Sequence, residues 1–303
     1  MANLRDIKKR INSVSSTEQI TRTMEMVSTA KIRQTLERAA NAMPYKNAIS
    51  DVMVTVASAQ DSAGENPMFK HHVNVENVLV IAIASDRGLA GGFNINIERE
   101  AENIYNRYKS KGVGCEIVTC GRKPTEYFHN RHVEPTLEFV GESADPTLKQ
   151  AKVLATFVRE GYIDERFDEV YIIYHHAKNR VDQELRVEQL LPLDTASVNL
   201  VRGPRSTEDD APKKVSGNFS YTPSAKHVLD HLIPSYVLTV IHQALIDSAA
   251  SEQGARRKAM HSATENAKTI IATLTRTYNR VRQASITTEI NEIVAGASAL
   301  EED

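Results

Sequence analysis

A glycine-rich turn is the best candidate for a ligand site in the sequence. Residues 85–94 read Ser-Asp-Arg-Gly-Leu-Ala-Gly-Gly-Phe-Asn, between an apolar β-rich run and a helical stretch. Backbone N–H groups in such a turn, at the start of a helix, can bind a phosphate. The glycine spacing fits neither the dinucleotide fingerprint nor a P-loop, so we interpret 85–94 as a structural turn, with a nucleotide-binding enzyme as the alternative. The residues expected to shape this turn are Asp86, Arg87, Gly88, Gly91 and Gly92.

Two histidines and two cysteines are the other candidates for chemistry. His227 and His231 are spaced to place two imidazoles on one helix face for a metal, but the sequence offers no third ligand. Cys115 and Cys120 lie at an odd spacing in a β-rich stretch, so we expect their thiols on opposite faces of a strand and reduced. No G-x-S-x-G pattern or paired-cysteine motif is present. The sequence therefore predicts no catalytic constellation, no metal site and no cofactor.

The middle of the chain must position the turn, and there strands alternate with helices. The β-rich apolar runs lie at 77–84, 114–120 and 169–175. The helical stretches between them lie at 94–111, 123–130 and 146–161. This alternation predicts a mostly parallel sheet covered by helices, in a Rossmann-like α/β domain. Residues 183–193 alternate in polarity after a short polar turn and predict an antiparallel edge strand.

Both ends of the chain carry long helical patterns. Apolar residues recur at steps of three and four from Leu4 to Met43, and Pro44 should kink or reset the axis before a further helical stretch at 45–60. After Pro234 the helical pattern continues for about 65 residues, or about 100 Å of helix. Helices of that length normally pair, so we expect an antiparallel coiled coil in which the C-terminal helix extends beyond the N-terminal one.

These patterns divide the chain into four parts. They are an N-terminal long helix at 1–60, a central α/β domain at 75–200, a surface loop at 201–220 and a C-terminal long helix at 221–303. The loop is assigned from its Gly, Pro and charged residues.

Charge and composition narrow the classes of function. The formal net charge is −2, yet Lys and Arg exceed Asp and Glu by five at 1–46 and by five again at 252–282. Two basic ends suggest that the terminal segments share an acidic partner surface. The longest apolar run, Val78–Ala84, is far shorter than the ~20 residues of a membrane-spanning helix. A nucleic-acid-binding coiled coil remains a third interpretation, which the modest basic counts and the aromatic share of 6% disfavour.

Three stretches of the sequence, taken together, resemble one family. The first includes Thr-Glu-Gln-Ile-Thr at 17–21 and Met-Glu-Met-Val at 24–27, and the second is the turn at 85–94. The third includes Ser-Glu-Gln at 251–253 and Arg-Gln-Ala-Ser-Ile-Thr-Thr-Glu-Ile at 282–290. In this order they resemble the γ-subunit family of F-type ATP synthases, of the bacterial type.

The resemblance implies a central rotor shaft. In that family the paired terminal helices enter a ring of three α and three β subunits, and the α/β domain joins the ε subunit and the membrane c-ring. Rotation driven by proton flow opens and closes each β-subunit site in turn, which couples proton flow to ATP synthesis and hydrolysis. The subunit itself is then non-catalytic, binds no nucleic acid and meets the membrane only through the Fo sector. Its expected location is peripheral, on the cytoplasmic face of the bacterial cell membrane.

The resemblance also carries over individual residues by position. The residues that match family positions for ring contact or coupling are Met24, Lys31, Arg256, Arg282, Gln283, Thr287 and Glu289. The alternative interpretation is that they pack in the coiled coil or form solvated helix faces. This alternative is strongest for Met24, because a methionine at helical spacing usually belongs to a core. We hypothesise that the loop at 202–218, within the surface loop, regulates contact with ε or restrains rotation.

Overall fold

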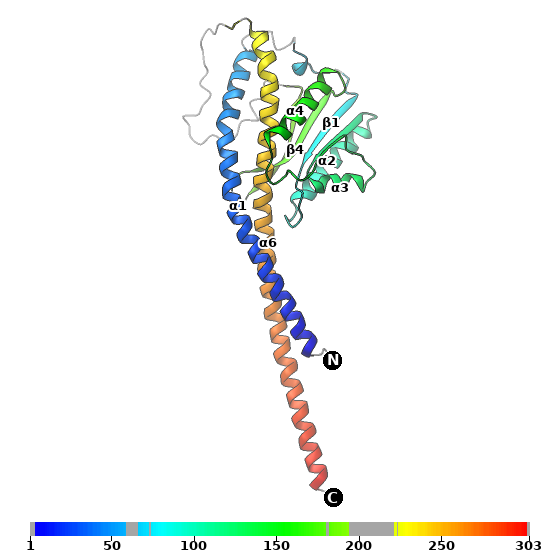
Figure 1. Ribbon diagram of the computed structural model, residues 1–303. Coiled ribbons are helices and arrows are strands. Elements are labelled where there is room, and N and C mark those ends of the chain that lie inside the picture. The colour runs from blue at the N-terminus through cyan, green and yellow to red at the C-terminus, as the bar shows by residue number, and fades with distance from the viewer. Residues whose placement is uncertain are drawn as a thin grey trace. The chain divides into compact units, whose positions relative to one another are not determined.

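The computed structural model describes residues 4–58, 66–72, 74–179, 182–193, 221–222 and 224–301 (Figure 1). The surface loop predicted at 201–220 therefore lies outside the described residues. The chain forms two compact units. We call Met1–Ser28 with Arg257–Asp303 the helical unit, and Thr29–Arg256 the α/β unit.

Two long helices, α1 (Leu4–Ser58) and α6 (Ala225–Glu301), contain 55 and 77 residues. Pro44 lies inside α1, which includes the further helical stretch expected after it, and α6 begins before Pro234. A proline inside a helix loses one backbone hydrogen bond and costs ~3 kcal/mol. Buried apolar residues lie near each proline, such as Ile49 in α1 and Ile233 in α6, and their burial helps to offset the cost.

The α/β unit is built on a five-stranded sheet in the order β3-β2-β1-β4-β5. The strands are β1 (Asn77–Ile83), β2 (Gly114–Cys120), β3 (Leu137–Phe139), β4 (Glu169–Ala177) and β5 (Gln183–Leu191). All neighbours run parallel except β4 and β5, which confirms the predicted parallel sheet with an antiparallel edge strand. Strand β3 was not predicted, because three residues are too few to show an alternating pattern.

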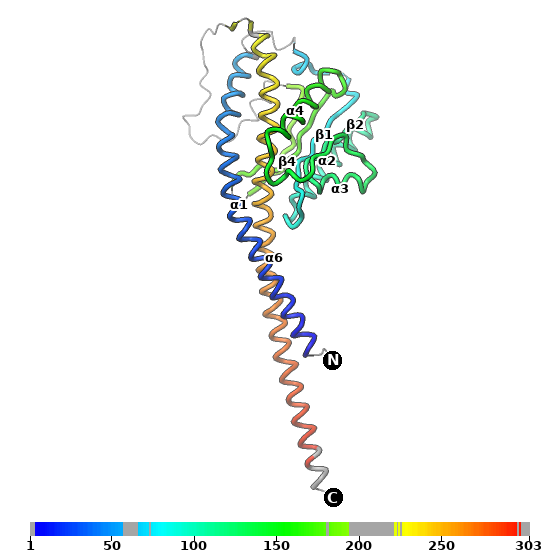
Figure 2. The backbone as a smooth tube through the Cα atoms, in the orientation of Figure 1, coloured from blue at the N-terminus to red at the C-terminus, as the bar shows by residue number. Residues whose placement is uncertain are grey.

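Helices cover both faces of this sheet (Figures 1 and 2). The elements are η2 (Pro67–Phe69), α2 (Phe93–Lys109), α3 (Arg122–His129) and α4 (Leu148–Ile163), together with the α/β-unit parts of α1 and α6. Leu79 and Ile81 of β1 pack in one core with α1, α4 and α6, while Val78 and Val80 pack in a second core with α2 and α3. Because both faces are covered, β1 is apolar after its first residue, Asn77, as is typical of a central parallel strand.

The two cysteines lie on opposite faces of β2, as their spacing predicts. Cys120 belongs to the core with α4 and α6, and Cys115 packs against the core with α2. Both are free thiols. Burial raises the pKa of each thiol to about 12, so both are protonated at neutral pH.

The helical unit contains the paired ends of α1 and α6. Thr21 and Thr264 share a buried hydrogen bond of 2.8 Å between hydroxyls, and Glu25 lies 3.0 Å from the Nδ1 atom of His261. Residue numbers rise on α1 as they fall on α6, so the pairing is antiparallel as predicted. Both helices rise by about 1.5 Å per residue, so equal numbers of residues span equal lengths. Counting from the pair Thr21–Thr264, Leu4 lies level with about residue 281 of α6. The last part of α6 therefore extends beyond the start of α1, as expected (Figure 1).

Candidate functional site at the carboxyl edge of the sheet

The topology of the sheet points to one edge as the place for a ligand. In open α/β sheets, ligands bind outside the carboxyl ends of the strands, where the strand order reverses. Here β1 is followed along the chain by β2 on one side and has β4 on its other side. The reversal therefore lies between β1 and β4, next to the glycine-rich turn that follows β1.

Helix α6 of the same chain occupies this position (Figure 2). The hydroxyl of Ser248 donates to the carbonyl of Ile83 at the end of β1, at 3.2 Å. The hydroxyl of Ser251 donates to the carbonyl of His175 near the end of β4, at 2.8 Å. Both serines are buried. The place where related sheets hold a ligand is thus filled by packed helix.

One turn further along α6, an ion pair closes over the glycine-rich turn. The guanidinium of Arg256 lies 2.6 Å from the carboxylate of Glu252. The same Nη2 atom donates to the carbonyls of Arg87 at 3.4 Å and Gly88 at 3.3 Å. Burial raises the pKa of Glu252, and the charge and hydrogen bond of Arg256 oppose that shift. The turn therefore presents carbonyl oxygens to a cation here, which is the opposite of the N–H groups that bind a phosphate.

The rest of the turn is held by its own side chains. The hydroxyl of Ser85 lies 2.6 Å from the carbonyl of Arg87 and 2.8 Å from the amide oxygen of Asn94. That amide oxygen also accepts from the backbone N–H of Ser85 at 3.0 Å. Asn94 stands in the first turn of α2, so these bonds tie the end of β1 to the start of α2.

Asp86 links the turn to the neighbouring loops. One carboxylate oxygen accepts from the backbone N–H groups of Arg122 and Gly141, at 2.9 and 2.8 Å, and the other accepts from that of Ser143 at 3.0 Å. Burial alone would raise the pKa of Asp86, but these hydrogen bonds outweigh it and lower the pKa. Asp86 is thus an ionised anchor for three segments.

The three glycine positions of the turn differ in how strictly their backbone conformation requires glycine. Gly91 has φ of 60°, in the left-handed region that favours glycine. A Cβ at Gly88 would meet nothing within 4 Å, and one at Gly92 would lie 3.4 Å from the side chain of Asn96. Leu89 also has a positive φ, of 64°, and its side chain is 63% exposed. The backbone conformation therefore demands glycine at Gly91 alone among the three.

Comparison with known proteins identifies the family. Residues 3–300 match the family described as ATP synthase. The chain is 39% identical over 302 residues to the ATP synthase gamma chain of Geobacter sp. (strain M21), with 99% of each chain covered. The chain belongs to the ATP synthase gamma chain family.

Two solved structures share the fold of this gamma-chain family member. A chain of the Euglena gracilis mitochondrial ATP synthase, in its OSCP/F1/c-ring structure, matches with a TM-score of 0.65 at 19% identity over 98% of this chain and 94% of that one. A chain of the Tetrahymena thermophila mitochondrial ATP synthase central stalk and c-ring matches with a TM-score of 0.60 at 22% identity, over 80% of this chain and 99% of that one. These structures bear out the predicted combination of a sheet core with long terminal helices.

The residues carried over from the family lie in different surroundings. In the helical unit, Met24 is half-buried, while four residues of α6 are exposed. Those four are Arg282, Gln283, Thr287 and Glu289. In the α/β unit, Lys31 is exposed, but the side chain of Arg256 is only 8% exposed and is engaged inside the chain. The set therefore contains five exposed residues, one intermediate residue and one buried residue.

Sequence reasoning missed the polar residues of α6 that fill the sheet edge. Asp247, Ser248 and Ser251 were not singled out as contacts, although all three are buried. A signal was present, because the apolar pattern of this helix is interrupted between Ile246 and Ala255 by small and polar residues. In a helix that is otherwise packed, such an interruption indicates a polar partner surface rather than solvent.

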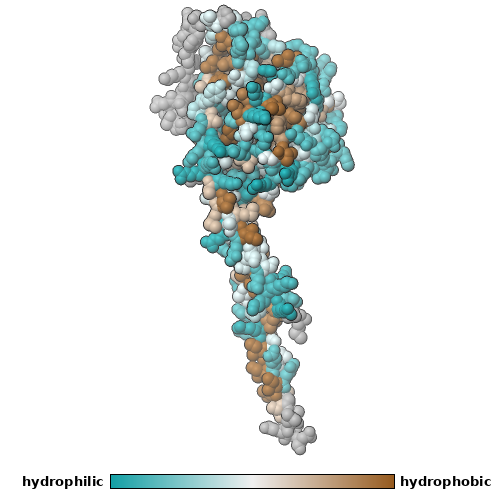
Figure 3. Space-filling view, viewed as in Figure 1, coloured by the Kyte–Doolittle hydropathy of each residue, from teal (hydrophilic) through white to brown (hydrophobic). Residues whose placement is uncertain are grey.

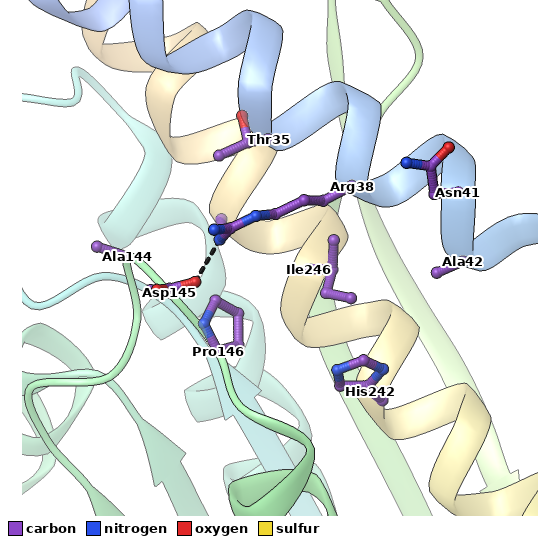
Figure 4. A pocket seen from close by; sticks show the side chains of 10 residues that line it. Thr35, Arg38, Asn41, Ala42, Ala144, Asp145, Pro146, His242 and Ile246 are labelled. Carbon is purple, nitrogen blue, oxygen red and sulfur yellow. Dashed lines mark hydrogen bonds and ion pairs between the residues drawn. The ribbon is translucent and has the colours of Figure 1, made fainter.

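A separate pocket of about 390 Å³ lies in the α/β unit between α1, α6 and the loop before α4 (Figure 4). Its lining residues are Thr35, Arg38, Asn41, Ala42, Ala144, Asp145, Pro146, His242, Ile246 and Ala249. Arg38 and Asp145 are bonded to each other across it. Burial lowers the pKa of His242, so its ring is neutral at pH 7. These groups do not form a nucleophile–base pair.

Within the described residues, neither a metal site nor a membrane-spanning helix is found. His227 and His231 stack edge to face with ring centroids 4.6 Å apart on α6. Among the described residues, no group of three His, Cys, Asp or Glu side chains is placed to hold a metal ion. No helix in the described part of the chain is long and apolar enough to cross a membrane.

Proposed function

We propose that this chain is the central rotor shaft of an F-type ATP synthase. Its paired helices couple proton flow to ATP synthesis and hydrolysis in a ring of three α and three β subunits, and so regulate both ATPase activity and proton flow. Membership of the gamma chain family supports this proposal, as does the likeness to central-stalk chains. The observation that carries it is the end of α6, which extends past α1 and exposes an apolar stripe.

That stripe is the surface proposed to turn inside the ring. Ile286, Ile290, Ile293 and Val294 are 47%, 54%, 71% and 58% exposed and follow the steps of one helix face. Figure 3 shows apolar side chains gathered along this part of the molecule. A run of large exposed apolar side chains is costly in water unless a partner covers it. Arg282, Gln283, Thr287 and Glu289 are exposed on the same segment and supply polar contacts to the ring.

The remaining carried-over residues take different roles in the proposal. Lys31 is exposed and available for an acidic partner surface. Met24 is half-buried and contributes both to helix pairing and to contact. Arg256 acts from inside the chain, because its guanidinium is committed to Glu252 and to the carbonyls of the glycine-rich turn.

We also propose that the chain is a non-catalytic subunit of the complex. Support comes from the sheet edge, where α6 occupies the position of a ligand and the turn directs carbonyl oxygens at Arg256. The nucleotide-binding alternative needs that space and those N–H groups. The α/β unit is proposed to join the ε subunit and the c-ring, so the chain is peripheral, meets the membrane only through the Fo sector and binds no nucleic acid. Its proposed location is the cytoplasmic face of a bacterial cell membrane.

Co-purification of the assembled complex tests the proposal. Ile290 and Ile293 are both changed to Ser in a tagged chain, with Val140→Ser, another exposed apolar residue at 44%, as the control. We expect the unchanged chain and the control to recover α and β subunits in excess with ATPase activity, and the double variant to lose that activity or the subunits. Recovery of the unchanged chain alone, with ATP bound to it, would support the nucleotide-binding alternative.

A further inference from the structure

Helix α6 carries a run of buried polar residues where it crosses the sheet edge. The buried polar side chains between residues 247 and 256 are Asp247, Ser248, Ser251, Glu252, Gln253 and Arg256. Each has a relative exposure between 0% and 7%. Burying a polar group is costly unless it is hydrogen-bonded, so the partners of this run decide what it does.

Three of these residues bond directly to the ends of two strands, and we call Asp247, Ser248 and Ser251 the polar seam. Asp247 accepts a hydrogen bond of 2.8 Å from the Nδ1 atom of His176 on β4, because a carboxylate oxygen can only accept. Both side chains of this pair are about 5% exposed or less. The two serines donate to the carbonyls of Ile83 and His175.

Residues from α6 and α1 also interact with the carboxylate of Asp247. Its second carboxylate oxygen accepts from the amide of Gln243, one turn earlier on α6, at 3.2 Å. Lys46 of α1 is buried, and burial lowers its pKa while the charges of Glu188 and Asp247 raise it. Both oxygens of Asp247 are thus engaged, and a cation from the third packed element faces the same carboxylate.

The geometry distinguishes the polar seam from ordinary packing. The hydrophobic effect is non-directional, so hydrogen bonds add an angular constraint to the packing of the apolar side chains of α6. Hydrogen bonds weaken steeply with misalignment, so three bonds to fixed backbone and side-chain atoms define one rotational setting. Buried polar pairs are weak contributors to net stability compared with apolar residues of similar shape. Setting the register or position of an element is the best-attested role of such pairs.

We propose that the polar seam fixes the rotational setting of α6 about its axis against the sheet, so that helix and α/β unit turn together under load. The inference rests on the proposed rotor function, and it makes Asp247, Ser248, Ser251 and His176 positioning residues. Torque that passes between the membrane ring and the α3β3 ring crosses this junction. A slipping junction lets ATP hydrolysis proceed without moving protons.

Two substitutions at His176 test the proposal in the assembled ATP synthase. His176→Asn keeps a nitrogen on Cγ, where the Nδ1 atom of histidine bonds to Asp247, whereas His176→Gln moves the amide nitrogen one bond further out. We measure ATP hydrolysis and ATP-driven proton pumping in membrane vesicles with a pH-sensitive dye. The expected result is a several-fold lower ratio of pumping to hydrolysis for His176→Gln, and a ratio near that of the unchanged chain for His176→Asn.

Controls separate a positioning role from loss of structure. His129→Gln breaks bonds between a histidine and Glu134 and Glu138 away from α6, and it should leave the ratio unchanged. Ser251→Ala removes one seam bond without adding bulk and should lower the ratio in the same direction. The seam variants are His176→Gln and Ser251→Ala. The proposal would be overturned if they lost hydrolysis and pumping equally, if neither variant assembled into the complex, or if the ratio of pumping to hydrolysis stayed unchanged. If the unchanged chain neither assembles nor pumps, the rotor function itself fails.

Discussion

Glu252 and Arg256 form an ion pair of 2.6 Å one turn apart on α6, with side chains 3% and 8% exposed. The pair is unlike Arg33 and Glu37, which have the same spacing on α1 but side chains 79% and 62% exposed. Removing one partner of a buried pair leaves an unpaired charge in a low-dielectric site. The surface pair is screened by water and contributes little.

Glu252→Ala is therefore expected to destabilise the chain by about 3–5 kcal/mol, because Arg256 then stays buried without a counter-charge. The matched control is Glu37→Ala, which should cost no more than about 0.5 kcal/mol. Denaturant unfolding of both variants gives the comparison. Equal midpoints for the two would mean that Arg256 finds water or another partner at no cost.

Gly91→Ala tests the backbone of the glycine-rich turn. With φ at 60°, a Cβ at this position should cost about 1–2 kcal/mol. Gly88→Ala is the control, because its added Cβ meets no atom within 4 Å and its φ is not positive. Thermal unfolding should place the first variant several degrees below the second. A Gly91 variant as stable as the Gly88 variant would contradict the left-handed conformation.

His175 predicts how stability depends on pH. Its ring stacks on Phe93 with centroids 5.0 Å apart, and burial lowers its pKa below the usual 6.5. Because the unfolded chain takes up a proton first, stability is present above pH 6.5 and is lost as pH falls below it, by at most about 1.4 kcal/mol per pH unit. His175→Phe should flatten this slope. Burial also lowers the pKa of His242, which contributes a slope of the same sign, so His242→Gln is the companion variant.

The two cysteines should react slowly in the folded chain. With a pKa of about 12 for each, almost no thiolate is present at pH 8. Iodoacetamide labelling followed by mass spectrometry should show slow modification, and addition of denaturant should accelerate it many-fold. Rapid labelling of Cys120 under native conditions would show that the core around β2 opens.

Much of this arrangement follows from local pattern. The apolar runs of β1, β2 and β4 are visible because strands that are buried on both faces consist mainly of apolar residues. The length of the terminal helices, and hence their pairing, follows from periodicity over many turns. Strand β3 escaped because its three residues carry no period.

The sheet edge could not be predicted in the same way. Ser248 and Ser251 donate hydrogen bonds to carbonyls that are far away in the sequence. A single sequence does not show which of its segments are in contact. The burial of Arg256 has the same origin, because a charged residue in a basic helical stretch reads as exposed until its partners are known.

Rotation of the chain within the assembled complex is the most direct test of the rotor function. A fluorescent probe is attached to a cysteine introduced as Lys111→Cys on the exposed turn after α2, and the α3β3 ring is fixed to a surface. The probe should react with the introduced cysteine only, because the pKa values of about 12 for Cys115 and Cys120 keep their thiols unreactive. On addition of ATP, we expect stepwise rotation of the probe in one direction. A probe that stays fixed while the complex hydrolyses ATP would contradict it.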